Sequence, residues 1–356
     1  MRRRDRVLAA LRHEVGDRAP MDFELSPSQV EQFRSRTNED DYRRCFGLEL
    51  RFVKAAELGE HPDWVRYLGD VPEGARVDEW GIGHWRKNPE LHFEHLLHPL
   101  ERCETLAQIE EYPFPDFSDE TRYAGLSAEV ARLKAEDYFV IGHCLSVGGT
   151  VLWPAYKLRS MEEHLLDLVL RPDLAVILLD RVTDAMIALA KNMAVTGVDA
   201  LLLADDFGTQ QSLLVSRDLF RKWYKPRLRK VVDAARSVNQ DIVVMFHSDG
   251  AIEPLIRDLI DVGIDVLNPV QPECMEPGDI KRRFGHELCF YGTVGTQTTM
   301  PFGTPEEVKR VVTERIRTVG RGGGLIVAPT HVVEPEVPWE NLLAFVEAVN
   351  ETGSYA

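Results

Sequence analysis

The sequence predicts an α/β fold in which parallel strands and their helices close into a (β/α)8 barrel. Seven short apolar runs are spread over the 356 residues, and amphipathic helical patterns separate most of them. Continuous apolar strands that alternate with helices are typical of a parallel sheet covered by helices on its outer face. The unclear region 45–125 is expected to hold an eighth strand. An open sheet is the alternative, but no GxGxxG or GxxxxGK(S/T) motif supports it.

The expected elements follow one another along the chain. A helix over 3–13 leads into the first strand at 18–24, and residues 25–125 are expected to form an irregular elaboration over the barrel mouth, within a single domain of residues 1–356. Most strand tips are polar or contain glycine, and the carboxyl rim of such a barrel is where its active site is expected. The other strands are expected at 137–144, 198–206, 241–250, 264–271, 288–295 and 323–331, and the clearest helical patterns cover 172–197, 216–238 and 304–320.

The composition excludes several classes of partner. The net charge is −16 and the only basic cluster, Arg2 to Arg4 with Arg6, is short, so neither nucleic acid nor an anionic membrane surface is expected. No apolar stretch approaches the roughly 20 residues of a membrane span, and the start of the chain lacks the apolar core of a signal peptide. Five scattered cysteines without a CxxC pair indicate reduced thiols. We expect a cytoplasmic protein with a small-molecule substrate, whose apolar helix faces would support a homodimer.

Two strand tips contain histidines that indicate a metal site. In HSDG (247–250), the alternation of side chains along a strand places His247 and Asp249 on the same side of the chain. His331 ends another strand at the same rim, in APTH (328–331), and supplies a third ligand. A His/Asp/His set with open positions suits zinc, or iron(II). The alternative is that Asp249 caps the following helix and that His247 is a buried, hydrogen-bonded histidine.

The tip ADDFG (204–208) holds two adjacent carboxylates, Asp205 and Asp206. On a continuing strand they point to opposite faces, so that one enters the barrel mouth and the other supports it. Burial near another acid raises the pKa of a carboxyl group and fits it for proton transfer, which predicts a catalytic role. The alternative is that Asp206 caps or turns the loop to the next helix.

Other side chains are expected near a substrate. Gln297 lies in the loop GTVGTQTTMPFG, whose glycines and hydroxyls suit a polar ligand. Trp80 and Arg86, in DEWGIGHWRK, would fit an anionic or planar ligand; a hairpin with tryptophans packed on the barrel is the alternative. Cys274, with Glu273 beside it, lies beyond its strand on the same rim and is a reserve soft ligand.

Four segments resemble the uroporphyrinogen decarboxylase superfamily. They are RDRVLAALRHEVGDRAPMDF near the start, LIDVGIDVLNPVQPECM, YGTVGTQTTMPFGTPEEV, and LIVAPTHVVEPEVPWENLLAFVEAV near the end. The resemblance spans most of the chain and is weakest over about 25–125. It implies a distorted (β/α)8 barrel with its site at the carboxyl rim, which agrees with the strand pattern.

Two branches of that superfamily differ in their chemistry. The decarboxylases act on a tetrapyrrole without metal and hold its carboxylates with an arginine-rich N-terminal motif, whereas the matching stretch here, APMDFELSPSQV (19–30), contains no arginine. The zinc-dependent methyltransferases move methyl groups between a corrinoid and a thiol, with an HxC motif and a later cysteine. In this chain HSD falls on the HxC position and His331 on the later cysteine. The resemblance therefore implies nitrogen and oxygen ligands, which leave an ion more Lewis-acidic than two thiolates do.

These features predict a metal-dependent enzyme that moves a methyl group from a small substrate to a corrinoid or related acceptor, with a corrinoid protein as a partner. In this hypothesis Asp205 or Asp206 orients the substrate or moves a proton, and Gln297 contributes a hydrogen bond. The alternative is a lyase that decarboxylates a porphyrinogen-like or other carboxylated ring compound without metal. A third interpretation is a non-catalytic subunit that has the barrel fold and binds a ligand or a partner but has lost the catalytic activity.

Overall fold

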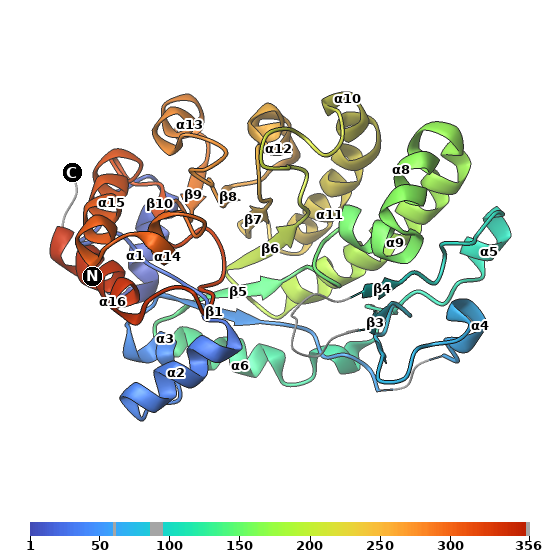
Figure 1. Ribbon diagram of the computed structural model, residues 1–356, viewed down its shortest axis with the longest axis horizontal. Helices are drawn as coiled ribbons and strands as arrows, with labels where there is room; N and C mark the ends of the chain where they lie inside the picture. The colour runs from blue at the N-terminus through green and yellow to red at the C-terminus, as the bar shows by residue number, and fades with distance from the viewer. Residues whose placement is uncertain (60–61, 86–94, 354–356) are drawn as a thin grey trace.

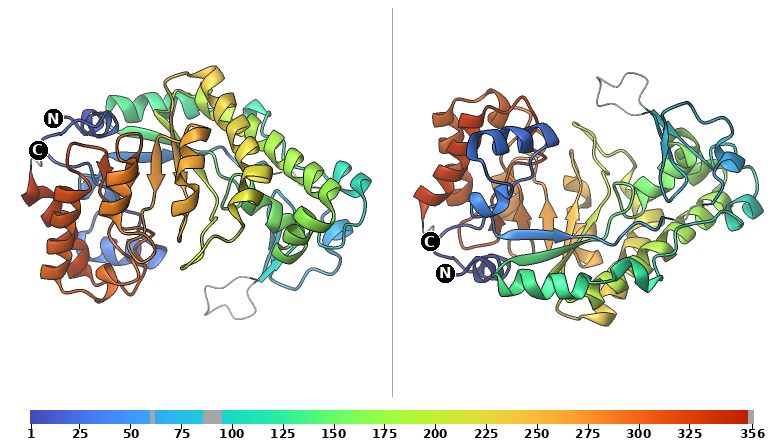
Figure 2. Two further views of the ribbon diagram at one scale, coloured as in Figure 1. Left: turned by 90° about the horizontal axis from the view of Figure 1, so that it is seen from above. Right: turned by 90° about the horizontal axis from the view of Figure 1, so that it is seen from below.

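The computed structural model describes residues 1–59, 62–85 and 95–353. Its centre is a curled sheet of seven parallel strands in the order β1-β5-β6-β7-β8-β9-β10 (Figures 1 and 2). Successive strands in the chain are therefore neighbours in space, as expected when each strand is followed by a helix that returns along the outer face. The strands are β1 (Leu50–Val53), β5 (Phe139–His143), β6 (Ala200–Ala204), β7 (Val243–His247), β8 (Val266–Asn268), β9 (Cys289–Tyr291) and β10 (Leu325–Ile326).

The strand positions agree with the sequence except at the first run. Each of the six later runs contains one of the strands β5 to β10, and β1 is the eighth strand that was expected within 45–125. The run 18–24 is not a regular strand. Isolated parallel bridges join Met21 to Val327, just beyond β10, and Leu25 to Val333. Among the described residues no ladder joins this segment to β1, so the continuous sheet has seven strands instead of the expected eight.

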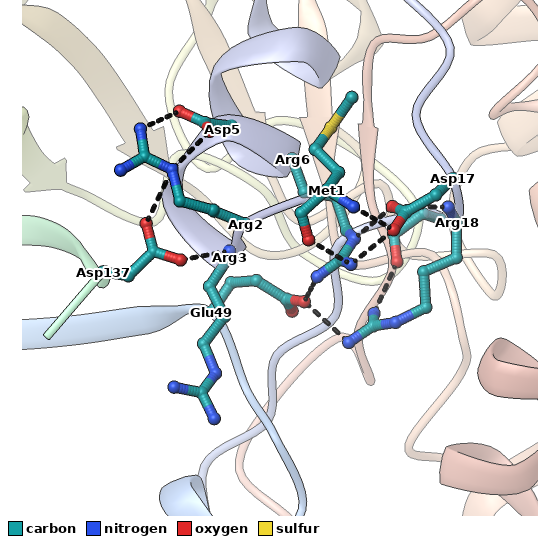
Figure 3. A network of polar contacts seen from close by, with 10 residues as sticks. Met1, Arg2, Arg3, Asp5, Arg6, Asp17, Arg18, Glu49 and Asp137 are labelled. Carbon is teal, nitrogen blue, oxygen red and sulfur yellow. Dashed lines mark hydrogen bonds and ion pairs between the residues drawn. The ribbon is translucent and has the colours of Figure 1, made fainter.

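A buried ion cluster, instead of a ladder, connects this first segment to β1. Glu49 directly precedes β1, is fully buried, and accepts a hydrogen bond of 2.9 Å from the backbone N–H of Met21. Its carboxylate lies 2.7 Å from a guanidinium nitrogen of Arg6 and 2.7 Å from one of Arg18 (Figure 3). Two cations and a backbone donor compensate for the water that this carboxylate loses on burial. Side chains thus tie the segment around Met21 to the start of β1.

Amphipathic helices cover the outer face of the sheet, as their apolar periodicity predicts. The helix α9 packs along α11, and α15 packs along α16. The pattern expected over 216–238 is interrupted by a π-helical turn, so it forms α10, that turn (Phe220–Tyr224) and α11. No helix in the described part of the chain is long and apolar enough to span a membrane. The helices of this layer are α6 (Leu126–Ala135), α7 (Leu152–Arg159), α8 (Met161–Leu170), α9 (Pro172–Val195), α10 (Arg217–Leu219), α11 (Lys225–Val238), α12 (Ile256–Val262), α13 (Pro277–Phe284), α14 (Thr299–Phe302), α15 (Pro305–Thr318) and α16 (Trp339–Thr352). The helix α1 (Arg3–Leu11) instead packs Val7, Leu8 and Leu11 against the core on the concave side of the sheet.

The region 25–125 is more regular than the sequence suggests. Besides β1, it contains a small antiparallel sheet in the order β2-β3-β4, which lies to one side of the main sheet (Figure 1). Arg159, at the end of α7, is fully buried and donates to the backbone carbonyls of Leu100 and Glu101 and to the carboxylate of Asp167, which ties this region to the helical layer. Its elements are β2 (Arg76–Val77), β3 (Gly83–Trp85), β4 (His95–Leu97), α2 (Pro27–Thr37), α3 (Tyr42–Cys45), α4 (Val65–Leu68) and α5 (Leu106–Glu110).

The strands separate two apolar cores. Alternation along β6 and β7 sends Leu203 and Phe246 into the core under the helices, and Ala200 and Met245 into a second core on the concave side. The concave core includes Leu202 of β6 and Met245 of β7, so the next inward-facing residue of β7 lies at the carboxyl end of the strand. His247, the last residue of β7, is half-buried at that level.

Candidate functional site

The register of β6 and β7 brings three potential metal ligands together. The two strands pair in parallel with Ala204 opposite His247. Asp206 follows Ala204 by two residues and Asp249 follows His247 by two, so all three polar side chains are on the same face of the pair. The Nε2 atom of His247 lies 3.8 Å from Oδ1 of Asp206 and 3.7 Å from Oδ2 of Asp249. One ligand atom from each residue lies within 4.8 Å of the others, which defines the Asp206–His247–Asp249 group.

Close contact between two loop backbones supports this geometry. The backbone N–H of Asp249 donates to Oδ1 of Asp206 at 2.9 Å. A Cβ atom on Gly208 would lie 2.6 Å from the carbonyl oxygen of Asp249, and one on Gly250, whose φ is +86°, would lie 2.6 Å from the carbonyl oxygen of Thr209. Only glycine allows this approach, because any side chain would push the loops apart. The glycines that end ADDFG and HSDG are therefore part of how the two aspartates meet.

The electrostatics of the group favour a bound positive charge. Burial lowers the pKa of His247, but its contact with Asp249 and the charges of Asp249 and Asp206 outweigh burial and raise that pKa to about 9. Burial raises the pKa of Asp206, against the opposing effect of His247. The side chains of His247, Asp206 and Asp249 remain 23%, 30% and 33% exposed, so an ion can reach them. One imidazole nitrogen and two carboxylates fit a divalent ion with nitrogen and oxygen preferences, such as zinc or iron(II).

A cavity of about 460 Å³ lies beside this group and shares Asp249 with it. Its wall carries the side-chain amides of Gln210, Gln271 and Gln297, together with the hydroxyls of three threonines. Its described lining contains two carboxylates and one histidine but neither lysine nor arginine. Such a wall suits a small, uncharged ligand that forms hydrogen bonds better than a molecule with many carboxylates.

Comparison with known proteins identifies the family of the chain. Residues 90–352 match the uroporphyrinogen decarboxylase (URO-D) family. The chain belongs to this family. Methylcobamide:CoM methyltransferase MtaA of Methanosarcina barkeri is 28% identical over 173 residues, which cover 49% of this chain and about half, 48%, of the relative's length. A uroporphyrinogen decarboxylase of Christiangramia forsetii is 22% identical over 368 residues, 99% of each protein. The structure of a methyltransferase from Methanosarcina mazei covers 99% of both chains at 21% identity with a TM-score of 0.69, so it shares the fold.

Relatives of this URO-D family member thus include both methyltransferases and decarboxylases, and the resemblance seen in the sequence is confirmed. The chain is a member of a family of enzymes, and either reaction is represented among its relatives.

In this URO-D family member the ligand group differs from the expected one at a single position. His331 is exposed, its ring centre lies 6.3 Å from that of His247, and it is not part of the group of three. Asp206 lies in the group instead, because the β6–β7 register brings that side chain to Nε2 of His247, and the ligand role expected for His331 stays a prediction. His331 instead lines the cavity.

The two adjacent aspartates have separate environments. Asp206 faces the ligand group, whereas Asp205 points the other way and is fully buried. The Asp205 carboxylate accepts hydrogen bonds from the backbone N–H groups of Thr150, Val151 and Trp153, at 3.2, 2.8 and 2.9 Å, at the start of α7. Burial raises the pKa of Asp205 to about 7, against the effect of these hydrogen bonds. A carboxylate enclosed in this way anchors the loop before α7, and the catalytic role expected for Asp205 stays a prediction.

The residues expected to bind substrate are dispersed. Gln297 is exposed and lines the cavity. Trp80 is fully buried, donates from its indole N–H to Ser146, and packs against Phe114 and Phe117, which matches the packed-hairpin alternative. Arg86 lies outside the described residues.

The reserve ligand Cys274 lies near the group without joining it. Its thiol donates to Oε1 of Gln210 at 3.2 Å, and burial together with the charges of Glu273 and Asp249 raises its pKa. A raised pKa disfavours the thiolate that a soft metal site requires. Glu273 accepts a hydrogen bond from the hydroxyl of Thr298.

Sequence reasoning missed one residue that contacts the group. Asn268, the last residue of β8, hydrogen-bonds His247. The signal was present in the run VLNPVQ, because an asparagine at the end of a buried strand, beside the strand that ends in histidine, is placed to reach that histidine.

Proposed function

We propose that this URO-D family member is a metal-dependent enzyme that transfers a methyl group from a small, uncharged substrate to a corrinoid or a related acceptor, with a corrinoid protein as partner. The observation that carries the proposal is the Asp206–His247–Asp249 group beside a cavity lined by amides and hydroxyls. The similarity to a methylcobamide:CoM methyltransferase supports the choice of reaction. Zinc is the preferred ion, and iron(II) the second choice.

In this proposal, different residues bind the metal ion and orient the substrate. His247, Asp206 and Asp249 hold the ion, which supplies Lewis acidity toward a substrate oxygen when bound. Gln297 and the neighbouring amides orient the substrate next to Asp249. In the transfer, the bond between the substrate's heteroatom and its methyl carbon breaks, the carbon bonds to the acceptor, and the heteroatom keeps the electron pair and takes up a proton. We also infer that the curled sheet is a (β/α)8 barrel in which residues 20–25 form the eighth strand. The parallel bridges at Met21 and Leu25 support this inference.

The decarboxylase alternative is supported by relatives that carry that name. The lining of the cavity argues for the methyl transfer, because a substrate with several carboxylates requires cations, and neither lysine nor arginine is among the described lining residues.

The proposal is tested by metal analysis followed by an activity screen. Purified chain, stripped with chelator and reconstituted, is expected to retain about one zinc or iron per chain. Reconstituted protein is then mixed with cob(I)alamin and with methanol or methyl ethers, and formation of methylcobalamin is followed by absorbance. Equal rates with stripped and reconstituted protein would contradict a metal-dependent reaction. Release of CO₂ from a carboxylated ring compound by stripped protein would establish the decarboxylase instead.

The pKa of His247 gives a pH dependence for metal binding. Because this pKa is raised to about 9, Nε2 carries a proton in the metal-free protein at neutral pH, and a metal ion must displace it. The apparent affinity for Zn²⁺ is therefore expected to rise about tenfold from pH 7 to pH 8 and to level off above about pH 9. Calorimetry at pH 7 in buffers of different ionisation enthalpy should show about one proton released per ion bound. An affinity that does not change between pH 7 and pH 8 would show that no proton is displaced from His247 in this range, which would contradict its raised pKa.

A further inference from the structure

The side chain of Asn268 lies between the ligand group and the neighbouring strand β9. In the parallel register of β7 and β8, Asn268 is paired with His247, so the two side chains are on the same face of the sheet. The residue is 9% exposed. Its side-chain oxygen is 2.6 Å from Nδ1 of His247, and its side-chain nitrogen is 2.7 Å from the backbone carbonyl oxygen of Tyr291 in β9.

The two contacts of Asn268 determine which nitrogen of His247 carries a proton. A backbone carbonyl only accepts hydrogen bonds, so the NH₂ group of Asn268 must face Tyr291 and its carbonyl oxygen must face His247. That oxygen also only accepts, so Nδ1 of His247 must be the donor. The neutral imidazole then has its lone pair on Nε2, the atom that lies 3.7 Å from Asp249 and 3.8 Å from Asp206.

We propose that Asn268 is a positioning residue that fixes the ring orientation and the tautomer of His247, so that Nε2 is presented to a metal ion held with Asp206 and Asp249. This inference rests on the proposed function, because it assumes that the group binds a metal. The anchor is rigid, since Asn268 is itself tied to the backbone of β9. Outer contacts of this kind typically contribute 10- to 100-fold to the metal affinity of a histidine ligand.

The test compares metal affinity in variants that separate the two hydrogen bonds of Asn268. Asn268→Leu keeps the approximate shape and removes both bonds, whereas Asn268→Asp keeps the acceptor for Nδ1 and removes the donor to Tyr291. We expect Asn268→Leu to weaken Zn²⁺ binding by about 10- to 100-fold, measured by chelator competition, and Asn268→Asp to recover most of the affinity. The visible spectrum of bound Co²⁺ should change in Asn268→Leu, which reports the coordination and not the stability of the fold.

Matched controls separate positioning from loss of stability. Asn192, on α9, also donates from its side-chain amide to a backbone carbonyl, that of Phe117 at 2.8 Å, so Asn192→Leu removes a comparable bond away from the group. It is expected to leave Zn²⁺ affinity unchanged. In the His247→Ala background, Asn268→Leu is expected to have no further effect on Zn²⁺ binding, because its contribution acts through the imidazole.

The outcomes distinguish the inference from the proposed function. Wild-type affinity and an unchanged Co²⁺ spectrum in Asn268→Leu would overturn the positioning role while leaving the metal site in place. A failure of the unmodified protein to bind Zn²⁺, Co²⁺ or Fe²⁺ after reconstitution would overturn the proposed function, and the positioning role with it.

Discussion

The substitution His247→Ala is expected to weaken Zn²⁺ binding by more than about 100-fold, which exceeds the usual effect of losing an outer contact. The reason is geometric: Nε2 of His247 is the one nitrogen in the group and lies between the two carboxylates, 3.8 Å from Asp206 and 3.7 Å from Asp249. The measurement is chelator competition on the purified variant. The fold should persist, because this side chain ends a strand at the rim and is 23% exposed.

His331→Ala is the informative comparison. His331 is not part of the group, so its loss is expected to leave Zn²⁺ affinity within about tenfold of wild type and to act on substrate binding, since His331 lines the cavity. The exposed His286, which pairs with Glu287, offers a control for removal of a surface histidine. Equal losses of metal in His247→Ala and His331→Ala would show that His331 is a ligand, as expected from the sequence.

The substitution Asp205→Ala is expected to lower the free energy of unfolding by about 3–5 kcal/mol, because it leaves buried backbone donors without an acceptor at about 1–3 kcal/mol each. Those donors are the N–H groups of Val151 and Trp153, and the Asp205 side chain is fully buried. The N–H of Thr150 keeps its hydrogen bond of 2.7 Å to the backbone carbonyl of Ala204. Gly149 shows how close the packing is, because a Cβ atom there would lie 2.6 Å from Oδ1 of Asp205. Urea denaturation measures the loss.

Asp206→Asn is expected to show the opposite behaviour. Its side-chain oxygen can still accept from the N–H of Asp249, so stability should change by less than about 1 kcal/mol, while loss of the charge should weaken Zn²⁺ binding. Folded Asp205→Ala, assayed at low temperature, should retain the ion. An Asp205→Ala variant of wild-type stability without activity would return Asp205 to the catalytic role that the sequence suggested.

Most of the fold was accessible from the sequence because it depends on local patterns. The apolar runs that became β5 to β10 and the periodic segments that became α9 and α15 carry their signals within a few turns or strands. The run 18–24 was harder to interpret, because its pairing depends on distant partners. Met21 meets Val327, and the junction with β1 is made by Glu49, whose role requires Arg6 and Arg18.

For the candidate site too, some features follow from the sequence and others only from the tertiary structure. The sequence by itself determined that His247 and Asp249 share a face and that Asp205 and Asp206 diverge, since both follow from the two-residue period of a strand. Only the tertiary structure decided which residues meet. The parallel register of β6 and β7 placed Asp206, and not His331, against His247, and the register of β7 and β8 placed Asn268 behind the imidazole. Register is a property of pairs of strands separated by whole helices in the chain, so no single segment contains it.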